Sequence, residues 1–320
     1  MNIMLETMLK LIERFDTIVI HRHQHPDYDA LGSQLGLKAL IEENYPTKHV
    51  YAVGDENRLT ALGRMDVIED AVYQEALAIV VDVAGKDRVS DTRFISAKER
   101  IIIDHHLNDT DIEGLFIQDT TAIAVAQMIT HMAQEVGWRF NPKAAQALMM
   151  GIITDSGRFL YPGVNEKTFE ATAVLMPHVG TLSSLYDAIY REPLNIKQLK
   201  GDALKRIVIT AGGVAVLRNG PTLKTTYGVD DFTVSRGLVS TMSYCEGAEA
   251  WVNFTEIESG DIWVEIRSAK VPVVEVAKAF GGGGHALACG CTLKDWSQSD
   301  TLIRALEEAL DKGETHETKT

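Results

Sequence analysis

Residues 17–44 read TIVIHRHQHPDYDALGSQLGLKALIEEN, and this stretch decides the fold. Its first five residues are mostly apolar and end on a histidine, which predicts a buried strand over 17–21. The segment 29–44 has the apolar pattern of a helix that starts shortly after that strand. A buried strand followed at once by a helix is typical of sheets whose strands run parallel.

The same alternation continues through the first half of the chain. Further strands are predicted at 48–54, 76–83 and 100–106, and helices at 121–137 and 142–157. This order predicts an α/β fold with a doubly wound, mainly parallel sheet. In such sheets, ligands bind beyond the carboxyl ends of the strands.

The second half predicts a smaller α/β domain. Strands are expected at 206–218, 248–268 (a hairpin that turns at Ser259-Gly260) and 285–293, and helices at 272–280 and 301–312. We therefore expect a first domain over 1–190, a linker over 191–205, a second domain over 206–312 and a disordered tail over 313–320, with a cleft between the domains.

Composition narrows the classes of partner. The net charge of −14 argues against a broad electrostatic contact with duplex nucleic acid. Three cysteines without a C-x-x-C pair indicate reduced thiols and a cytoplasmic protein. The first 16 residues predict an amphipathic helix rather than a signal peptide, and no apolar run reaches the roughly 18 residues that a membrane span needs.

Five polar side chains crowd the segment after the first strand. His21, His23, His25, Asp27 and Asp29 all fall at odd positions, so on an extended chain they would share one face. From this segment alone, a metal site, a solvated edge strand and an accident of composition are all open.

Similar polar clusters follow other predicted elements. They are Asp82 in VVDVAG, then Asp104-His105-His106, then Asp155 in GIITDSG. An aspartate after a strand is usually a turn former or a helix cap, so these residues indicate a metal site only because they occur together at one edge of the sheet. Imidazole and carboxylate ligands without thiolate suit manganese, magnesium, iron or cobalt.

The number of carboxylates favours two metal ions. Asp27, Asp29, Asp82 and Asp155 bring four negative charges, which would repel one another without metal and which two divalent cations would neutralise. Two ions about 3.5–4 Å apart can activate a shared water near neutral pH and hold the oxygens of a phosphoryl group. The cluster therefore predicts a hydrolase of phosphate esters or anhydrides.

In this order the motifs resemble those of the DHH phosphoesterase superfamily. The resemblance implies two divalent ions, usually manganese, one on His23, Asp27 and Asp82 and the other on Asp29, Asp82, His105 and Asp155. It also implies that His106 faces the substrate phosphate and donates a hydrogen bond or a proton to the leaving oxygen, and that Asp104 orients a histidine ring. On this basis His106, Asp82 and Asp104 are the expected catalytic residues, His21 is structural and His25 is left without a role.

The segment GGGGH at 281–285 has two explanations from its residues alone: a helix stop with a tight turn, or a backbone cradle for an anion. WVEIRSAK at 263–270 and VVEVAKAFGGGGHALACG at 273–290 resemble the DHH-associated domain. That resemblance implies substrate contacts from Arg267, Ser268, Gly282, Gly283, Gly284 and His285, with Lys270 and Arg236 as weaker candidates. Phe159 and Tyr161 either pack in the core, which is the favoured explanation, or stack on a base. Arg158 either lies at the surface without a specific role or contacts a phosphate.

Across nearly its whole length the chain is most similar to the group of bifunctional oligoribonucleases and pAp phosphatases. This implies a manganese-dependent enzyme that hydrolyses short oligoribonucleotides (nanoRNA, pApA) to 5′-mononucleotides and pAp to AMP and phosphate. The expected partners are short single-stranded RNA or a small nucleotide, with no duplex nucleic acid and no membrane. A homodimer is a candidate assembly. The alternatives are a cyclic di-AMP phosphodiesterase, a hydrolase of the pyrophosphatase or exopolyphosphatase type, and a nucleotide-sensing protein without turnover.

Overall fold

The computed structural model describes residues 3–56, 59, 62–107 and 109–317. The chain divides into two compact units, Met1–Arg191 and Glu192–Thr320. None of the described helices combines the length and the apolar character that crossing a bilayer requires.

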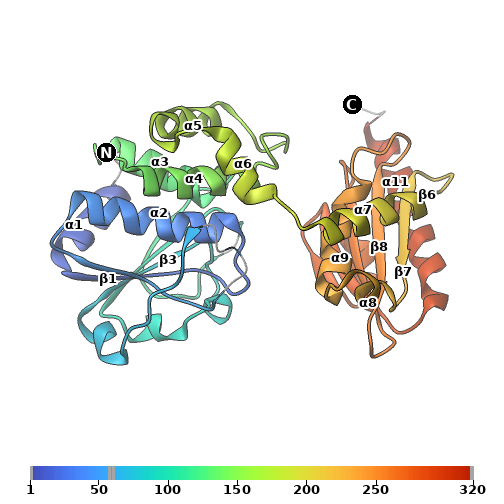
Figure 1. The fold of residues 1–320 in the computed structure, drawn as a ribbon, viewed down its shortest axis with the longest axis horizontal. Coiled ribbons are helices and arrows are strands. Elements are labelled where there is room, and N and C mark those ends of the chain that lie inside the picture. The colour runs from blue at the N-terminus through green and yellow to red at the C-terminus, as the bar shows by residue number, and fades with distance from the viewer. Residues whose placement is uncertain (1–2, 57–58, 60–61, 108, 318–320) are drawn as a thin grey trace. The chain divides into compact units, whose positions relative to one another are not determined.

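The first unit is built on a five-stranded sheet in which every neighbouring pair of strands is parallel (Figure 1). The strand order is β2-β1-β3-β4-β5. The bounds are β1 Thr17–His21, β2 His49–Ala52, β3 Leu77–Val81, β4 Glu99–Asp104 and β5 Leu115–Gln118. The predicted parallel sheet is confirmed, and β5 is an additional strand whose four residues are too few to show a periodic pattern.

Both faces of this sheet are covered, but by different elements. The helices α1 to α4 pack their apolar residues against one face, while two 3-10 segments, η2 and η4, cover the other (Figure 1). The helices of the unit are α1 Ile3–Arg14, α2 Tyr28–Asn44, α3 Val125–Glu135, α4 Pro142–Asp155, α5 Glu166–Val179 and α6 Leu182–Tyr190, and the 3-10 segments are η2 Asp70–Glu75, η3 Lys86–Arg88 and η4 Thr92–Ser96. The expected doubly wound arrangement is therefore confirmed, with short 3-10 segments in place of long helices on the second face.

Small residues let α2 and α4 approach each other closely. A Cβ atom added at Gly32 would lie 2.3 Å from the carbonyl oxygen of Ala147, and one added at Gly151 would lie 2.8 Å from Oδ1 of Asp29. Because neither position has room for a methyl group, the separation of the two helices is set by bare backbone. This contact brings the last turn of α4 next to the first turn of α2.

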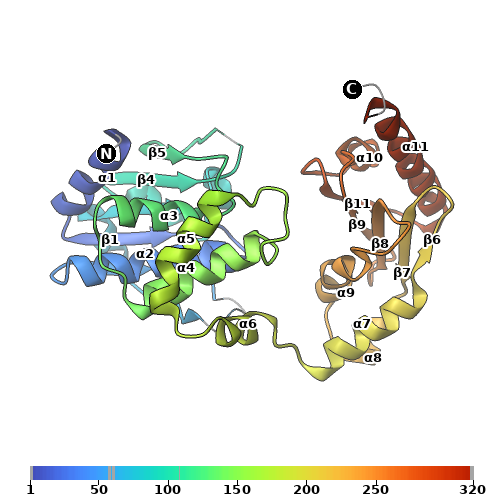
Figure 2. The same cartoon turned by 90° about the horizontal axis from the view of Figure 1, so that it is seen from above.

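The second unit is a six-stranded mixed sheet in the order β10-β11-β9-β8-β7-β6. Helices cover both faces, with α10 and α11 on one side and α7 and α9 on the other (Figure 2). The strands are β6 Val208–Ile209, β7 Val214–Asn219, β8 Ala250–Glu256, β9 Ile262–Ser268, β10 Gly283–Gly284 and β11 Ala288–Leu293; the helical segments are α7 Leu194–Arg206, α8 Leu223–Tyr227, α9 Asp231–Val239, η5 Ser240–Met242, α10 Val274–Ala279, η6 Trp296–Gln298 and α11 Ser299–Glu317. The smaller α/β domain and the hairpin between β8 and β9 are confirmed.

Three expectations for the second half need correction. The segment 191–205 was expected to link the domains, but most of it forms helix α7, whose Leu199 and Ala203 are buried in the second unit. The strand expected at 206–218 is divided into β6 and β7, because the chain turns at Gly213 with a φ of 77°. The tail expected from 313 is helical as far as Glu317, since α11 continues to that residue, and 318–320 lie outside the described residues.

His21 ends β1 inside the apolar layer, which confirms its structural role. Its ring lies 5.7 Å from that of Tyr73 and 5.9 Å from that of Phe94, between ring centres. Burial lowers the pKa of His21 to about 4, an effect that nearby Asp91 only partly offsets. The imidazole is therefore neutral in the folded protein at neutral pH.

The lowered pKa of His21 predicts a loss of stability in acid. The unfolded chain takes up a proton near pH 6.5 and the folded chain only near pH 4, so the contribution of His21 to the free energy of unfolding should fall by about 3 kcal/mol as pH drops through this window. The free energy of unfolding of wild type relative to His21→Leu should therefore fall by most of this amount between pH 7 and pH 4.5, as measured by urea unfolding of both proteins. The control His49→Leu replaces an exposed histidine, and an unchanged acid profile in His21→Leu itself would show that His21 is not the group responsible.

Candidate metal centre

The polar residues singled out from the sequence meet at the carboxyl edge of the first sheet. Asp104 ends β4, and Asp82 directly follows β3 with a left-handed backbone (φ of 59°). The segment after β1 does not present its polar residues on one extended face, which corrects that expectation. Instead the chain turns at exposed His25 with a φ of 51°.

In the described part of the chain, three overlapping groups of side chains have potential ligand atoms within 4.8 Å of one another. They are His23 with Asp27 and Asp82, Asp29 with His105 and Asp155, and Asp82 with His105 and His106. All six predicted metal ligands therefore come together, and Asp82 and His105 each belong to two groups. Because neighbouring groups share members, the arrangement suits more than one cation at short separation.

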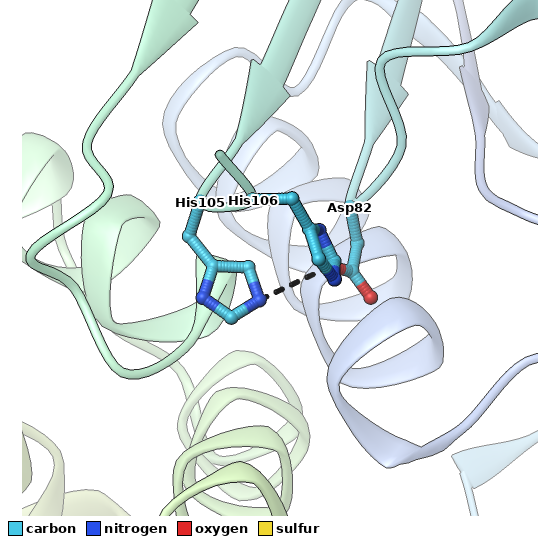
Figure 3. Close-up of side chains that lie close together, drawn as sticks. All are labelled: Asp82, His105 and His106. Atoms are coloured by element: carbon cyan, nitrogen blue, oxygen red, sulfur yellow. Dashed lines mark ion pairs between the residues drawn. The ribbon is translucent and has the colours of Figure 1, made fainter. Parts of the chain in front are cut away.

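Asp82 lies at the centre of this arrangement. Its Oδ2 is 3.4 Å from Nε2 of His23, and its Oδ1 is 3.6 Å from Nε2 of His105 (Figure 3). The side chain is almost completely buried, and Oδ1 has no hydrogen-bond partner among the residues that the structure describes. Burial, together with the negative charges of Asp29 and Asp27, raises the pKa of Asp82 well above its usual range.

Asp29 and Asp155 bring two further carboxylates to the same place. Asp29 is fully buried, and Asp155 is 3.6 Å from Nε2 of His105 through its Oδ2. Burial raises the pKa of both groups, and for Asp155 the charges of Asp29, Asp27 and Asp82 add to the effect. In the absence of a cation these carboxylates destabilise one another.

Asp29 has a second role that its sequence position does not indicate. Its two carboxylate oxygens accept hydrogen bonds from the backbone N–H groups of Val125 (2.7 Å) and Ala126 (2.9 Å) at the start of α3. The residue before that helix provides no side-chain cap, so Asp29 satisfies these amides from a distant part of the chain. Oδ1 also accepts the hydroxyl of Ser33 at 3.2 Å, whereas Oδ2 keeps a lone pair that can still bind a cation.

Asp27 is held by the helix that it begins. Its Oδ1 accepts hydrogen bonds from the backbone N–H groups of Asp29 and Ala30, both at 3.0 Å, as the N-cap of α2. The side chain remains 58% exposed, and the same oxygen lies 3.9 Å from Nε2 of His23. The turn-forming and the metal-binding explanations are therefore compatible for this residue.

His106 is fixed by Asp104. Its Nδ1 lies 2.7 Å from Oδ1 of Asp104, which also accepts the backbone N–H of His106 at 3.2 Å. A carboxylate accepts at this distance, so the proton is on Nδ1 of the ring. Because this contact uses Nδ1, the nitrogen that is 3.7 Å from Oδ1 of Asp82, it disfavours coordination through that atom (Figure 3). The predicted orienting contact of Asp104 is thus present, and the histidine that it orients is His106.

The chemistry of the donors fits divalent cations. The groups offer carboxylate oxygens and imidazole nitrogens without a thiol, which suits manganese, magnesium, iron or cobalt. The buried Oδ1 of Asp82 has no donor among the described residues, and an unpaired buried carboxylate oxygen is costly unless a cation compensates it.

The residues expected to contact substrate in the second unit lie near one edge of its sheet. Arg267 on β9 donates to the backbone oxygen of Ile266 (2.8 Å) and pairs with Glu265 (3.1 Å), which also pairs with Arg236 on α9 at 3.1 Å. Ser268 is buried, with its hydroxyl 3.4 Å from the backbone oxygen of Glu249, and Lys270 is exposed.

The last two glycines of the run form a short strand rather than an open loop. Gly283 and Gly284 form β10 and pair with Gly290 and Cys289 of β11. A Cβ atom added at Gly282 would lie 2.1 Å from the carbonyl oxygen of Gly290, so a close backbone contact requires glycine there. His285 is exposed at the turn between the two strands. Gly282 and the two glycines of β10 thus have a structural explanation, and an anion-binding role for the exposed edge is additional to it.

Comparison with known proteins gives matches to both units. Residues 17–152 match the DHH family, N-terminal domain, and residues 228–312 match the DHHA1 domain. Over 306 residues the chain is 37% identical to the bifunctional oligoribonuclease and PAP phosphatase NrnA of Bacillus subtilis, covering 94% of this chain and 96% of that protein. It is 34% identical over 306 residues to the probable bifunctional oligoribonuclease and PAP phosphatase NrnA of Streptococcus mutans, covering 95% and 98%. An exopolyphosphatase-related protein from Bacteroides fragilis has the same fold, with a TM-score of 0.84 and 22% identity over 97% of this chain and 96% of that one.

Proposed function

Because the chain belongs to the DHH family, we propose that it is a metal-dependent phosphoesterase that hydrolyses short oligoribonucleotides to 5′-mononucleotides and pAp to AMP and phosphate. The observation that carries the proposal is the centre around Asp82, where three groups of ligand atoms overlap. The full-length similarity to two NrnA proteins supports the choice of substrate.

The proposal assigns two divalent ions, manganese above others, to the six residues His23, Asp27, Asp29, Asp82, His105 and Asp155. When bound, the ions would provide an activated water and hold the oxygens of the phosphoryl group. The chain's own contribution is positional, because Asp82 lies between two groups and Asp29 is fixed by the amides of α3.

His106 is the residue that we assign to protonation of the leaving oxygen. Asp104 keeps the ring in one orientation and stabilises its positive charge when the imidazole carries a second proton.

In the second unit, we assign substrate contacts to Arg267, Ser268, Gly282, Gly283, Gly284 and His285. The net charge of −14 supports small substrates over a duplex, and the three free cysteines support a cytoplasmic location.

Product analysis with Mn²⁺ tests the proposal. The substrates are pAp, pApA, a five-nucleotide RNA, cyclic di-AMP and pyrophosphate, each incubated with wild type, with wild type plus EDTA and with Asp82→Asn. We expect AMP from pAp and pApA and mononucleotides from the RNA, no product with EDTA, and pyrophosphate untouched. Hydrolysis of pyrophosphate alone would replace the proposal with a pyrophosphatase, and binding of cyclic di-AMP without any product would indicate a sensor.

The pairing of Asp104 with His106 predicts a defect in turnover without loss of metal. Asp104→Asn should lower kcat for pAp by about tenfold to a hundredfold, because the histidine ring loses its fixed orientation and the partner of its charge. The number of bound Mn²⁺ ions, measured on the purified variant, should stay at the wild-type value. A parallel loss of bound metal would show that Asp104 acts through the ions instead.

The homodimer stays a prediction, which the molecular mass in solution would check.

A further inference from the structure

A left-handed turn directly follows α4 and its last residue, Asp155. Three consecutive residues have positive φ angles: Gly157 (55°), Arg158 (65°) and Phe159 (67°). Only glycine adopts this region readily, and a bulky residue held there costs of order 1–3 kcal/mol, which is typical of functional sites. The turn is fixed by buried Ser156, whose hydroxyl accepts the N–H of Phe159 at 2.9 Å.

The turn places a cation over an aromatic ring at the surface. The guanidinium carbon of exposed Arg158 lies 5.5 Å from the centre of the Tyr190 ring, at the end of α6. Among the residues that the structure describes, no carboxylate forms an ion pair with Arg158. Arg158 is thus a positive charge without a carboxylate partner in the described part of a chain whose net charge is −14.

Exposed aromatic side chains gather around the same turn. Within the described part of the first unit, the Phe, Tyr and Trp side chains that are more than about a third exposed are Tyr161 (53%), Phe169 (55%) and Tyr190 (37%). Phe169 stacks on Phe159 of the turn, with 5.5 Å between ring centres. Burial raises the pKa of Tyr190, so its phenol is neutral at physiological pH and does not repel an anion.

Arg158 and the exposed aromatic side chains Tyr161, Phe169 and Tyr190 form a patch on elements that adjoin the metal centre. Tyr28 lies in sequence between Asp27 and Asp29, and its hydroxyl donates to the backbone oxygen of Ala188 in α6 at 3.4 Å. Helix α6 also contacts α4, which ends on Asp155 (Figure 2). The arginine and the aromatic rings are therefore carried by elements that also carry or adjoin three of the metal-site aspartates.

We propose that Arg158, Tyr161 and Tyr190 form a nucleotide subsite for a residue of the RNA beyond the one whose phosphate is hydrolysed. Arg158 pairs with a backbone phosphate, and the tyrosine rings stack on a base, which every base allows because each has a π-face. This inference rests on the proposed function and adds a prediction to it. An oligoribonucleotide uses the subsite, whereas pAp, with a single nucleoside, does not.

Steady-state kinetics on two substrates test the subsite. KM and kcat are measured for a five-nucleotide RNA and for pAp with wild type, Tyr190→Ala, Arg158→Ala and Ile95→Ala. The last variant removes a 60% exposed apolar side chain from η4, which packs on the opposite face of the sheet. Thermal melting of each variant checks that it is folded.

We expect Tyr190→Ala and Arg158→Ala each to raise KM for the RNA about tenfold, to change its kcat little and to leave pAp hydrolysis as in wild type. Tyr190→Phe, which keeps the ring, should recover most of the lost RNA affinity. Equal effects on both substrates, or no effect on either, would overturn the subsite while leaving the proposed function in place. If wild type hydrolyses pAp but not the RNA, the subsite is wrong, and so is the oligoribonuclease part of the proposed function. If wild type hydrolyses neither substrate, the proposed function is wrong and the subsite has no basis.

Discussion

Asp82→Asn should lower kcat for pAp by about a thousandfold or more, and it should do so in a protein that remains folded. Asp82 lies within reach of both His23 and His105, so its loss disturbs both proposed ions at once. An effect of this size corresponds to about 4 kcal/mol of transition-state stabilisation, within the range expected for electrostatic groups at a reacting phosphate. The measurement is steady-state hydrolysis of pAp at saturating Mn²⁺.

Asparagine is the appropriate replacement because of the backbone. Position 82 has a φ of 59°, a region that Asn tolerates and most other residues avoid. Without metal, the variant should be at least as resistant to urea as wild type, because it removes a buried carboxylate that repels its neighbours. Asp16→Asn, at an exposed position before the amino end of β1, serves as the control and should keep wild-type kcat. Retention of kcat within about tenfold of wild type in Asp82→Asn would refute the shared role of this residue.

Adding Mn²⁺ to the metal-free protein should raise the melting temperature of the first unit by roughly 8–16 °C. At a free concentration about a thousand times the dissociation constant, binding to the folded state alone contributes about 4 kcal/mol, and each kcal/mol corresponds to about 2–4 °C for a domain of this size. The rise should be absent or much smaller in Asp82→Asn. No shift with Mn²⁺, Mg²⁺ or Co²⁺ would argue against a metal centre.

The same carboxylates give the metal-free protein a characteristic dependence on pH. Asp29, Asp82 and Asp155 have raised pKa values when folded, so above the unfolded value of 3.8 the folded chain retains more protons than the unfolded chain. The free energy of unfolding should therefore fall as pH rises from about 3.8 through the raised pKa values. With Mn²⁺ bound this fall should disappear, since the ions stabilise the ionised carboxylates. Urea unfolding from pH 5 to pH 8, with and without Mn²⁺, measures both trends.

Much of the first unit could be predicted because its signals are local. An apolar run such as 77–81 buries on both faces and needs no partner to be recognised as a strand. In parallel strands the polar residues that follow each run meet at one edge, so the meeting of Asp82 and Asp104 follows from the fold class alone. The short strand β5 lacks any such signal.

The features that could not be predicted depend on contacts distant in sequence. The amides that hold Asp29 come from Val125 and Ala126, and no pattern around Asp29 indicates them. Whether GGGGH is a turn, a cradle or a strand is decided by pairing with β11, which forms only when the sheet is assembled. The left-handed turn contains Arg158 and Phe159, residues whose ordinary preferences are against it.

The contact between α2 and α4 has a practical meaning for anyone who redesigns this protein. Replacing a helical glycine with alanine is a routine stabilising substitution, worth up to about 1 kcal/mol where the space exists. At Gly32 and Gly151 the added methyl would instead force the helices apart, and with them Asp29 on α2 and Asp155 on α4. A thermostability library for this scaffold should therefore leave both glycines unvaried, because the distance between two helix backbones here also sets the distance between two metal-site carboxylates.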